Sequence, residues 1–495
     1  MGQPLRKNDI EDQQKESLKE KNKNQMDKKT LLKLLPVILI PLALWITPAP
    51  SGLKAETWHV VALYIALLLG LVIKPFSEPV ITLIIIGIVS MFMGPEIPLA
   101  GYGTEMVWFI VMVTIVCAAF VKTGLGKRIA YNLLTRFGKN SLGLGYIMMF
   151  VDLILSPATG SNMSRASIDY PIFRNIAESV GSTPEKDPRK LGSYLTMLMY
   201  VVSMSTAVLF LTGMATNAIT ASLAKEMLGV NIDWMTWFKA AIVPAGLVLA
   251  LGPIIVYKLY KPDLTDLGDI KPLMKQGLQE MGPMKKDEKI LAVLFVLAVL
   301  GWMFGPKITA LHLTMQVVAF VFLALTLLFK ILNWNDVISQ KGAWNTFIWY
   351  GAFYGVAATL ADQGFYTWLA EILDKHLKLG QLNGLLVTVV LLFISLAVRY
   401  FFVSNSAFVA SFYPVLFALA LTTQANIMVV ALLLAFFAGY GALLTHYGNG
   451  AGIYTFATGY CSQKDFWRVG TIMVGVAIIV FLFIGLPYWK LIGIW

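Results

Sequence analysis

The sequence predicts an all-α polytopic membrane protein built from inverted repeats. Of the 495 residues, 57% are hydrophobic and 14% are charged, and the mean hydropathy is +0.71. Soluble proteins carry about a quarter charged residues, so this composition is typical of an integral membrane protein. A short polar pattern also occurs twice, near residues 161 and 404. Its recurrence after about half of the chain indicates a duplicated architecture.

Apolar runs recur along the chain at lengths close to the ~20 residues that a helix needs to cross a bilayer. None alternates with the two-residue period of a membrane barrel strand. We therefore expect helical spans at residues 31–46, 58–73, 79–93, 107–121, 241–257, 290–304, 313–329 and 469–484.

Charge distribution sets the expected orientation. The loop 122–139 holds five basic residues and no acid, which by the positive-inside rule places it in the cytoplasm. Four spans precede this loop, so the N-terminus is expected there too. Residues 1–30 are highly charged and predict a cytoplasmic tail. Nothing in this tail marks an organellar transit peptide, which favours a bacterial plasma membrane.

The repeated pattern reads S-N-x7-Y-P. It begins at Ser161 and again at Ser404, and 404 minus 161 gives an offset of 243 residues. Each copy follows an apolar run that is interrupted before it can cross the bilayer comfortably. We therefore expect two re-entrant helical hairpins, an inward-opening one around residues 142–173 and an outward-opening one around residues 386–418.

Two further apolar runs are interrupted by glycine and polar residues, at 212–217 and at 445–450. Both predict broken helices. The charged stretch 258–289 reads as a cytoplasmic linker between a first half, 31–257, and a second half, 290–495. Counting spans places the two halves in opposite orientations, which is the inverted-repeat plan of secondary transporters.

Hairpin tips and broken helices expose unpaired N–H groups at helix starts, where anions are favoured. The short polar side chains there either cap the helices or contact a ligand, and two matched copies favour both roles together. The predicted substrate-binding residues are Ser161, Asn162, Met163, Arg165, Thr216, Asn217, Arg399, Ser404, Asn405, Ser406, His446, Gly448 and Asn449.

Three cationic side chains lie near these breaks. A cation at membrane depth is costly and usually faces the protein interior. Arg165 has a possible partner in Asp169 at i+4, so a local ion pair and a substrate-facing role stay open. Arg399 and His446 have no such neighbour, which favours a role near the substrate. Asp152 has no basic residue within four positions, and it either pairs across helices or carries a proton.

Several function classes find no support. The chain has no P-loop, metalloprotease or G-x-S-x-G pattern, so an enzyme is not expected. The net charge of +11 arises in short loops between spans and marks no nucleic-acid surface. The two cysteines do not form a ligand pattern, and we expect neither a metal site nor a cofactor.

With these features in place, residues 31–495 resemble the divalent anion:sodium symporter family. The resemblance implies a homodimer in the lipid bilayer, each protomer having about eleven transmembrane helices and two re-entrant hairpins. It also implies an elevator-type transporter of dicarboxylates, tricarboxylates or sulfate. Ser161-Asn162 and Ser404-Asn405 match the two Ser-Asn-Thr tips of that family.

The departures from that motif concern coupling. Met163 and Ser406 stand in the two threonine positions, and a thioether is not a sodium ligand. The fixed cation Arg165 repels Na⁺ and attracts a carboxylate. In this the chain is similar to the exchanger branch of the family, which includes citrate/succinate and tartrate/succinate antiporters and the plastid oxoglutarate/malate translocator. We expect exchange of dicarboxylates such as 2-oxoglutarate, malate or succinate without sodium. The alternatives are a sodium-coupled di- or tricarboxylate symporter and, more distantly, an anion channel.

Overall fold

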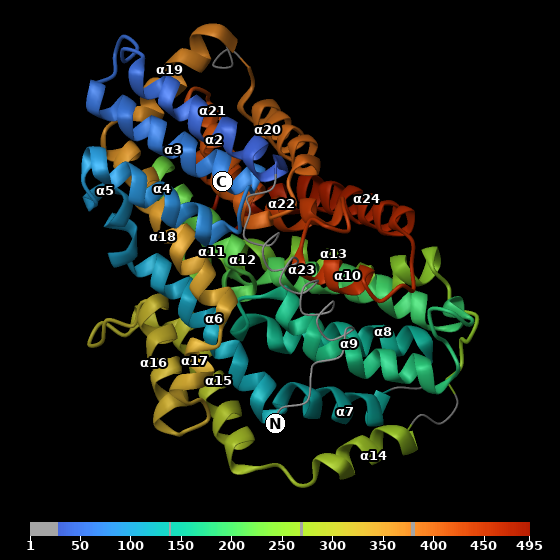
Figure 1. Cartoon of the computed structure of the whole chain (residues 1–495). Helices are drawn as coiled ribbons and strands as arrows, with labels where there is room; N and C mark the ends of the chain where they lie inside the picture. The colour runs from blue at the N-terminus through green and yellow to red at the C-terminus, as the bar shows by residue number, and fades with distance from the viewer. Residues whose placement is uncertain (1–27, 138–139, 268–270, 378–381) are drawn as a thin grey trace, which may run out of the picture. The chain divides into compact units, whose positions relative to one another are not determined.

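The computed structural model describes residues 28–137, 140–267, 271–377 and 382–495 (Figure 1). Within these ranges every named element is a helix, and extended pairing is limited to one isolated bridge between Asn140 and Asp266. The predicted all-α membrane fold is confirmed. Most of the predicted tail, residues 1–27, lies outside the described residues.

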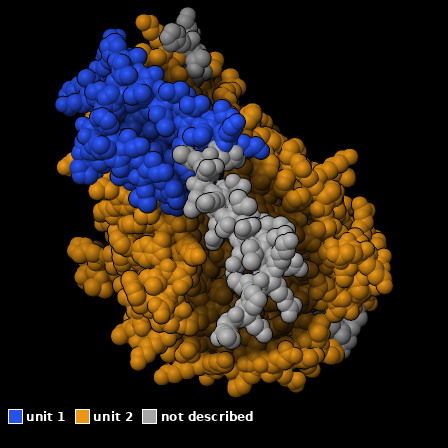
Figure 2. Space-filling view, in the orientation of Figure 1, with its two compact units in different colours: residues 1–95 blue, residues 96–495 orange. Residues whose placement is uncertain are grey.

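The chain divides into two compact units, residues 1–95 and residues 96–495 (Figure 2). In the first, α2 (Lys28–Ile46), α3 (Ala55–Ile73) and α4 (Glu78–Met93) pack in sequence order. Only 11% of the apolar window of α2 is buried, so its leucines and isoleucines face outward. An apolar surface of this kind is stable in hydrocarbon and unstable in water.

Within the second unit, the two hairpins have the same build. The first joins α8 (Ser141–Leu155) to α9 (Asn162–Ser179), and the second joins α20 (Gly384–Val398) to α21 (Asn405–Leu421). Short 3₁₀ turns, η2 (Ser156–Ala158) and η7 (Arg399–Phe401), follow the first arms. Each second arm begins one residue after the serine of the repeated pattern.

Among the described residues, two helices are broken at the predicted positions. The first runs as α10 (Gly192–Leu209), η4 (Leu211–Gly213) and α11 (Ala215–Leu228), and the second as α22 (Ile427–Tyr440), η8 (Gly441–Leu443) and α23 (Gly450–Phe456). The halves of the sequence interlock, because α9 packs against α23 and α11 packs against α21. The apolar window of α10 is fully buried, which places this helix at the core of the unit.

The remaining elements complete the second unit. They are α5 (Glu96–Leu99), η1 (Ala100–Gly103), α6 (Glu105–Thr123), α7 (Leu125–Phe137), η3 (Pro188–Lys190), α12 (Trp234–Ile242), α13 (Pro244–Leu259), α14 (Lys271–Met281), α15 (Lys286–Phe304), η5 (Gly305–Lys307), α16 (Met315–Leu328), α17 (Trp334–Ile338), α18 (Lys341–Asp362), α19 (Phe365–Leu377), α24 (Gln463–Val480), a π-helical turn (Phe481–Gly485) and α25 (Leu486–Leu491).

By length and composition, eight described helices are able to cross a membrane, or nine if the bent pair α12–α13 counts as one span. Shorter apolar helices, including α4 and α16, fall below that length criterion. The expected number of eleven spans stays a prediction.

A buried ion pair holds α7 against the start of α15. Arg128 donates from its guanidinium to both carboxylate oxygens of Glu288, and its Nη1 donates to the carbonyl of Gly282 at 3.0 Å. Glu288 is only 1% exposed. The C-terminal end of the linker is therefore held against α7, the helix that precedes the first hairpin.

We predict that Arg128→Ala destabilises the protein by about 3–5 kcal/mol, because it leaves the Glu288 carboxylate buried without its partner. Thermal unfolding in detergent measures the effect. Arg174→Ala is the control, since its 2.7 Å pair with Glu178 is exposed and such pairs contribute at most about 1 kcal/mol. Equal shifts for the two variants would show that the buried pair is not structural.

Candidate functional site

The polar tips and breaks meet across the two halves of the chain. Asn162, at the first tip, donates from Nδ2 to Oδ1 of Asn449, at the second break, over 3.1 Å. The hydroxyls of Thr216, after the first break, and Ser406, at the second tip, lie 3.3 Å apart. Each hairpin tip therefore contacts the broken helix of the other half. Four of the predicted site residues are brought together by these two contacts.

Both tip serines cap their helices. The Ser161 hydroxyl accepts from the backbone N–H of Ser164 at 3.2 Å, and the Ser404 hydroxyl accepts from that of Ala407 at 3.3 Å. Short hydroxyl side chains suit this position because they satisfy an orphan donor of the first turn. The remaining N–H groups of the two helix starts lie beside the meeting point and favour a negatively charged ligand.

The asparagines at the breaks complete the ends of the preceding helices. Asn217 donates from Nδ2 to the carbonyls of Ala207 and Phe210, both at 2.8 Å. Asn449 donates to the carbonyl of Ala442 at 3.1 Å. A carbonyl freed by a helix break has no water to bond inside the membrane, so a side-chain amide must supply the donor. The Asn217 and Asn449 side chains therefore stabilise the backbone at the two helix breaks.

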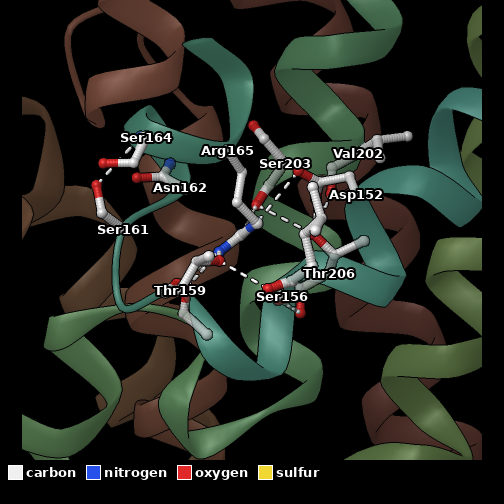
Figure 3. Close-up of polar contacts among 12 residues, drawn as sticks. Asp152, Ser156, Thr159, Ser161, Asn162, Ser164, Arg165, Val202, Ser203 and Thr206 are labelled. Atoms are coloured by element: carbon white, nitrogen blue, oxygen red, sulfur yellow. Dashed lines mark hydrogen bonds and ion pairs between the residues drawn. The ribbon is translucent and has the colours of Figure 1, made fainter. Parts of the chain in front are cut away.

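Arg165 is buried between the first hairpin and the first broken helix, with no exposed surface. Its Nε donates to Asp152 at 3.1 Å, and its Nη atoms donate to the carbonyls of Thr159 at 3.0 Å, Gly213 at 2.7 Å and Ser203 at 3.0 Å. Figure 3 shows the side chain running into this cluster, away from Ser161 and Asn162.

The ion-pair partner of Arg165 is therefore Asp152, on the other arm of the hairpin, and not Asp169. The second oxygen of Asp152 accepts from the Thr206 hydroxyl on α10. The i+4 spacing on α9 allows a contact with Asp169, but folding of the hairpin brings α8 closer to the guanidinium. Asp152, whose role the sequence left open, is paired across helices.

Arg399 is also buried, with 1% of its surface exposed, but its surroundings differ. One Nη donates to the carbonyl of Phe402 at 2.5 Å and the other to the carbonyl of Gly448. The guanidinium carbon lies 5.3 Å from the ring centroid of Phe408. Its Nε has no partner, and no ion pair among the described residues involves it. The positive charge of Arg399 is therefore uncompensated.

The two arginines occupy equivalent places in the two halves. Thr159 and Phe402, whose carbonyls they bind, are separated by the same 243 residues as the tip serines. Gly213 and Gly448 lie in the two breaks. Each arginine thus fastens a hairpin tip to a broken helix. Sequence reasoning missed this relation because Arg165 lies on the second arm and Arg399 on the first, so they do not align.

The remaining predicted residues line the same region. The Asn405 Oδ1 is buried without a hydrogen-bond partner. Met163 is 49% exposed, and its side chain lies where a Cβ on Gly450 would stand. His446 accepts at Nδ1 from the Trp467 indole N–H over 3.2 Å, and its ring lies 4.3 Å from that of Phe456.

Among the described residues, no group of three or more His, Cys, Asp or Glu side chains is arranged to hold a metal ion. What converges at the site is instead a set of hydrogen-bond donors, two helix starts and one unpaired guanidinium. Such an arrangement is chemically suited to an anion, which charge-assisted hydrogen bonds favour.

A profile described as the sodium:sulfate symporter transmembrane region matches residues 28–495. The chain belongs to this family. The resemblance drawn from the repeated Ser-Asn tips is confirmed. Proteins similar to this chain include the inner membrane protein YbhI of Escherichia coli K12, which is 40% identical over 479 residues, or 95% of this chain and 99% of YbhI.

Two other similar proteins have names that state a substrate. The putative malate transporter YflS of Bacillus subtilis is 34% identical over 94% of this chain and 98% of its own. The L-tartrate/succinate antiporter of Escherichia coli O157:H7 is 31% identical over 92% of this chain and 96% of its own.

A solved structure shows a similar fold. The YdaH transporter of Alcanivorax borkumensis superposes with a TM-score of 0.51 over 94% of this chain and 99% of that one. At 14% sequence identity, this similarity concerns the fold alone.

We predict that Asn405→Ala, like Asn162→Ala, abolishes transport while the protein stays folded. The Asn405 Oδ1 has no hydrogen-bond partner in the structure, so we expect its loss to cost little folding stability. Asn217→Ala is the contrasting variant, because it removes the donor to the buried Ala207 carbonyl, at a cost of about 1–3 kcal/mol. Uptake into proteoliposomes and thermal stability in detergent separate the two effects. A purely structural role for the tips would appear as loss of folded Asn405→Ala protein.

Proposed function

We propose that this protein is a secondary transporter that exchanges dicarboxylates of the 2-oxoglutarate, malate and succinate type, without sodium coupling. The observation that carries the proposal is the uncompensated guanidinium of Arg399 at the point where tips and breaks meet. The first hairpin contributes no net charge through its arginine, because Asp152 neutralises Arg165.

The names of relatives support the substrate class and the mode of transport. One relative is named a malate transporter and another an L-tartrate/succinate antiporter, and both match over most of this chain. Malate, tartrate and succinate carry two carboxylates on a short carbon chain. One end of such a molecule fits the Arg399 charge, and the other end fits the N–H groups of a hairpin tip.

Exchange follows from the fixed charge. A buried cation in an empty site makes movement of that site through the bilayer costly, whereas a bound dianion compensates the charge. The carrier then moves only when loaded, and net uptake requires a counter-substrate. Sodium is disfavoured at the first tip because the Met163 side chain offers a thioether and no oxygen ligand there.

The architecture supports alternating access by an elevator movement. Amphipathic helices α7 and α19 precede the two hairpins at corresponding positions, and inverted repeats with broken helices are typical of such carriers. We expect a homodimer in the plasma membrane with a cytoplasmic N-terminus. The second candidate is a sodium-coupled symporter, which is favoured by the two Ser-Asn pairs and by the description of the family.

We predict that purified protein in vesicles loaded with succinate takes up labelled 2-oxoglutarate, and that empty vesicles take up almost none. The rates should be equal in sodium and potassium buffers, because no site for sodium is required. Flux measurements under the two salts provide the test. Uptake into empty vesicles driven by an inward sodium gradient would instead establish the symporter.

We predict that Arg399→Ala weakens the apparent affinity for dicarboxylate roughly tenfold or more, since a nearby charge contributes several kcal/mol at an effective dielectric constant of about 20. Arg399→Lys, the matched control, should recover part of the affinity because it keeps the charge but loses the planar fork. Competition by unlabelled succinate measures both. If the Arg399→Ala variant still exchanged dicarboxylates with unchanged apparent affinity, the Arg399 charge would have no role in the mechanism.

A further inference from the structure

Asp169 is a buried acid that the exchange mechanism does not use. It lies on α9, two turns after the first tip, with no exposed surface. Neither of its carboxylate oxygens has a hydrogen-bond partner. The acid on the neighbouring arm differs, because both oxygens of Asp152 accept hydrogen bonds.

The groups around Asp169 leave it without a counter-charge. Asp152 and Arg165 act on it electrostatically, but they are bonded to each other and carry no net charge as a pair. Cys117 on α6 is a further titratable neighbour. A carboxylate in this position would be a single uncompensated negative charge.

The helices packed most extensively against α9 are α7, α8, α10 and α23, and α6 contributes Cys117. Among these, α10 and α23 contain no Asp, Glu, Lys, Arg or His, and their phenols are Tyr194, Tyr200 and Tyr454. On α7, Arg128 is held by Glu288, and Lys127 and Arg136 are exposed. None of these elements provides a cation that pairs with Asp169.

Burying an unpaired carboxylate costs several kcal/mol or more, and a group in such a place takes up a proton instead. A neutral carboxyl tolerates the absence of a salt bridge. The structure therefore fits a protonated Asp169, with the Asp152–Arg165 pair neutral and Arg399 providing the net positive charge of the region.

We propose that Asp169 is a proton-binding site linked to the dicarboxylate site, so that substrate binding and proton binding favour each other. This proposal rests on the proposed function. When Asp169 loses its proton, the new negative charge cancels the net charge that attracts a dianion. By linkage, a bound dianion then raises the affinity of Asp169 for its proton by the same factor.

The sequence repeat indicates that only the first of the two halves has an acid at this position. The position of the second half that corresponds to Asp169 is Phe412, at the same offset of 243 residues. The proposed proton site therefore lies in the first hairpin, where Asp152 neutralises Arg165. The second hairpin, which carries Arg399 without an ion-pair partner, has no equivalent.

The test is titration calorimetry of succinate binding to the purified full-length protein, in two buffers of different ionisation enthalpy. Between about pH 6.5 and about pH 8.5 the ligand is a dianion, so proton uptake reports on the protein. We expect uptake that rises toward one proton per site, and a dissociation constant that increases up to about tenfold per pH unit as the free protein loses its proton. Asp169→Asn should bind without proton uptake and without this pH dependence.

Two controls identify the group. Glu226→Gln, which neutralises an acid bonded by the Tyr354 hydroxyl, should leave proton uptake unchanged. His446→Gln tests the other titratable side chain of the site, and loss of proton uptake in this variant alone would overturn the proposal. If Asp169→Asn does not fold, Asp169→Glu replaces it, and uptake should persist with a displaced midpoint.

Two outcomes separate the proposal from the function on which it rests. Succinate binding by the unaltered protein without proton uptake would overturn the role of Asp169 and leave dicarboxylate transport standing. Absence of binding for succinate, malate and 2-oxoglutarate at every pH would overturn the proposed function, and the proton linkage with it.

Discussion

A backbone polar group buried in a membrane protein must find its hydrogen bond within the protein, and this constraint governs the centre of the structure. Two hairpin turns and two helix breaks leave carbonyls and N–H groups without partners inside their own helices. Serine hydroxyls cap the helix starts, asparagine amides cover the helix ends, and arginines bind the carbonyls between them. Most polar side chains of the site are therefore occupied by the fold itself.

The charged and polar atoms that the backbone does not occupy determine the chemistry of this region. Both halves use an arginine to join a tip to a break, but only the first half supplies a carboxylate for it. The second half offers the face of Phe408 instead, which does not cancel the charge. The contact between arginine, tip and break is therefore neutral in the first half and positively charged in the second half. The charge of this region is therefore asymmetric although its architecture is repeated.

Much of the fold was predictable from local patterns. Apolar runs near the length of a span, and serine before a helix start, depend on residues close in sequence, and both give reliable expectations. The offset between Ser161 and Ser404 located the two tips. The same offset did not reveal that Arg165 and Arg399 correspond, because the aligned positions hold Phe408 and Ser156. Equivalent places in space were filled from opposite arms of the hairpins.

The sequence by itself determined the all-α membrane fold, the two polar tips and the excess of cationic side chains near them, because length, hydropathy and capping are local properties. Only the tertiary structure decided which charges meet. The i+4 spacing on α9 made Asp169 a possible ion-pair partner of Arg165. In the folded hairpin the partner is instead Asp152, on the other arm. Pairing of buried charges depends on distances of a few ångströms between segments. Such distances are fixed by packing, and no run of neighbouring residues encodes them.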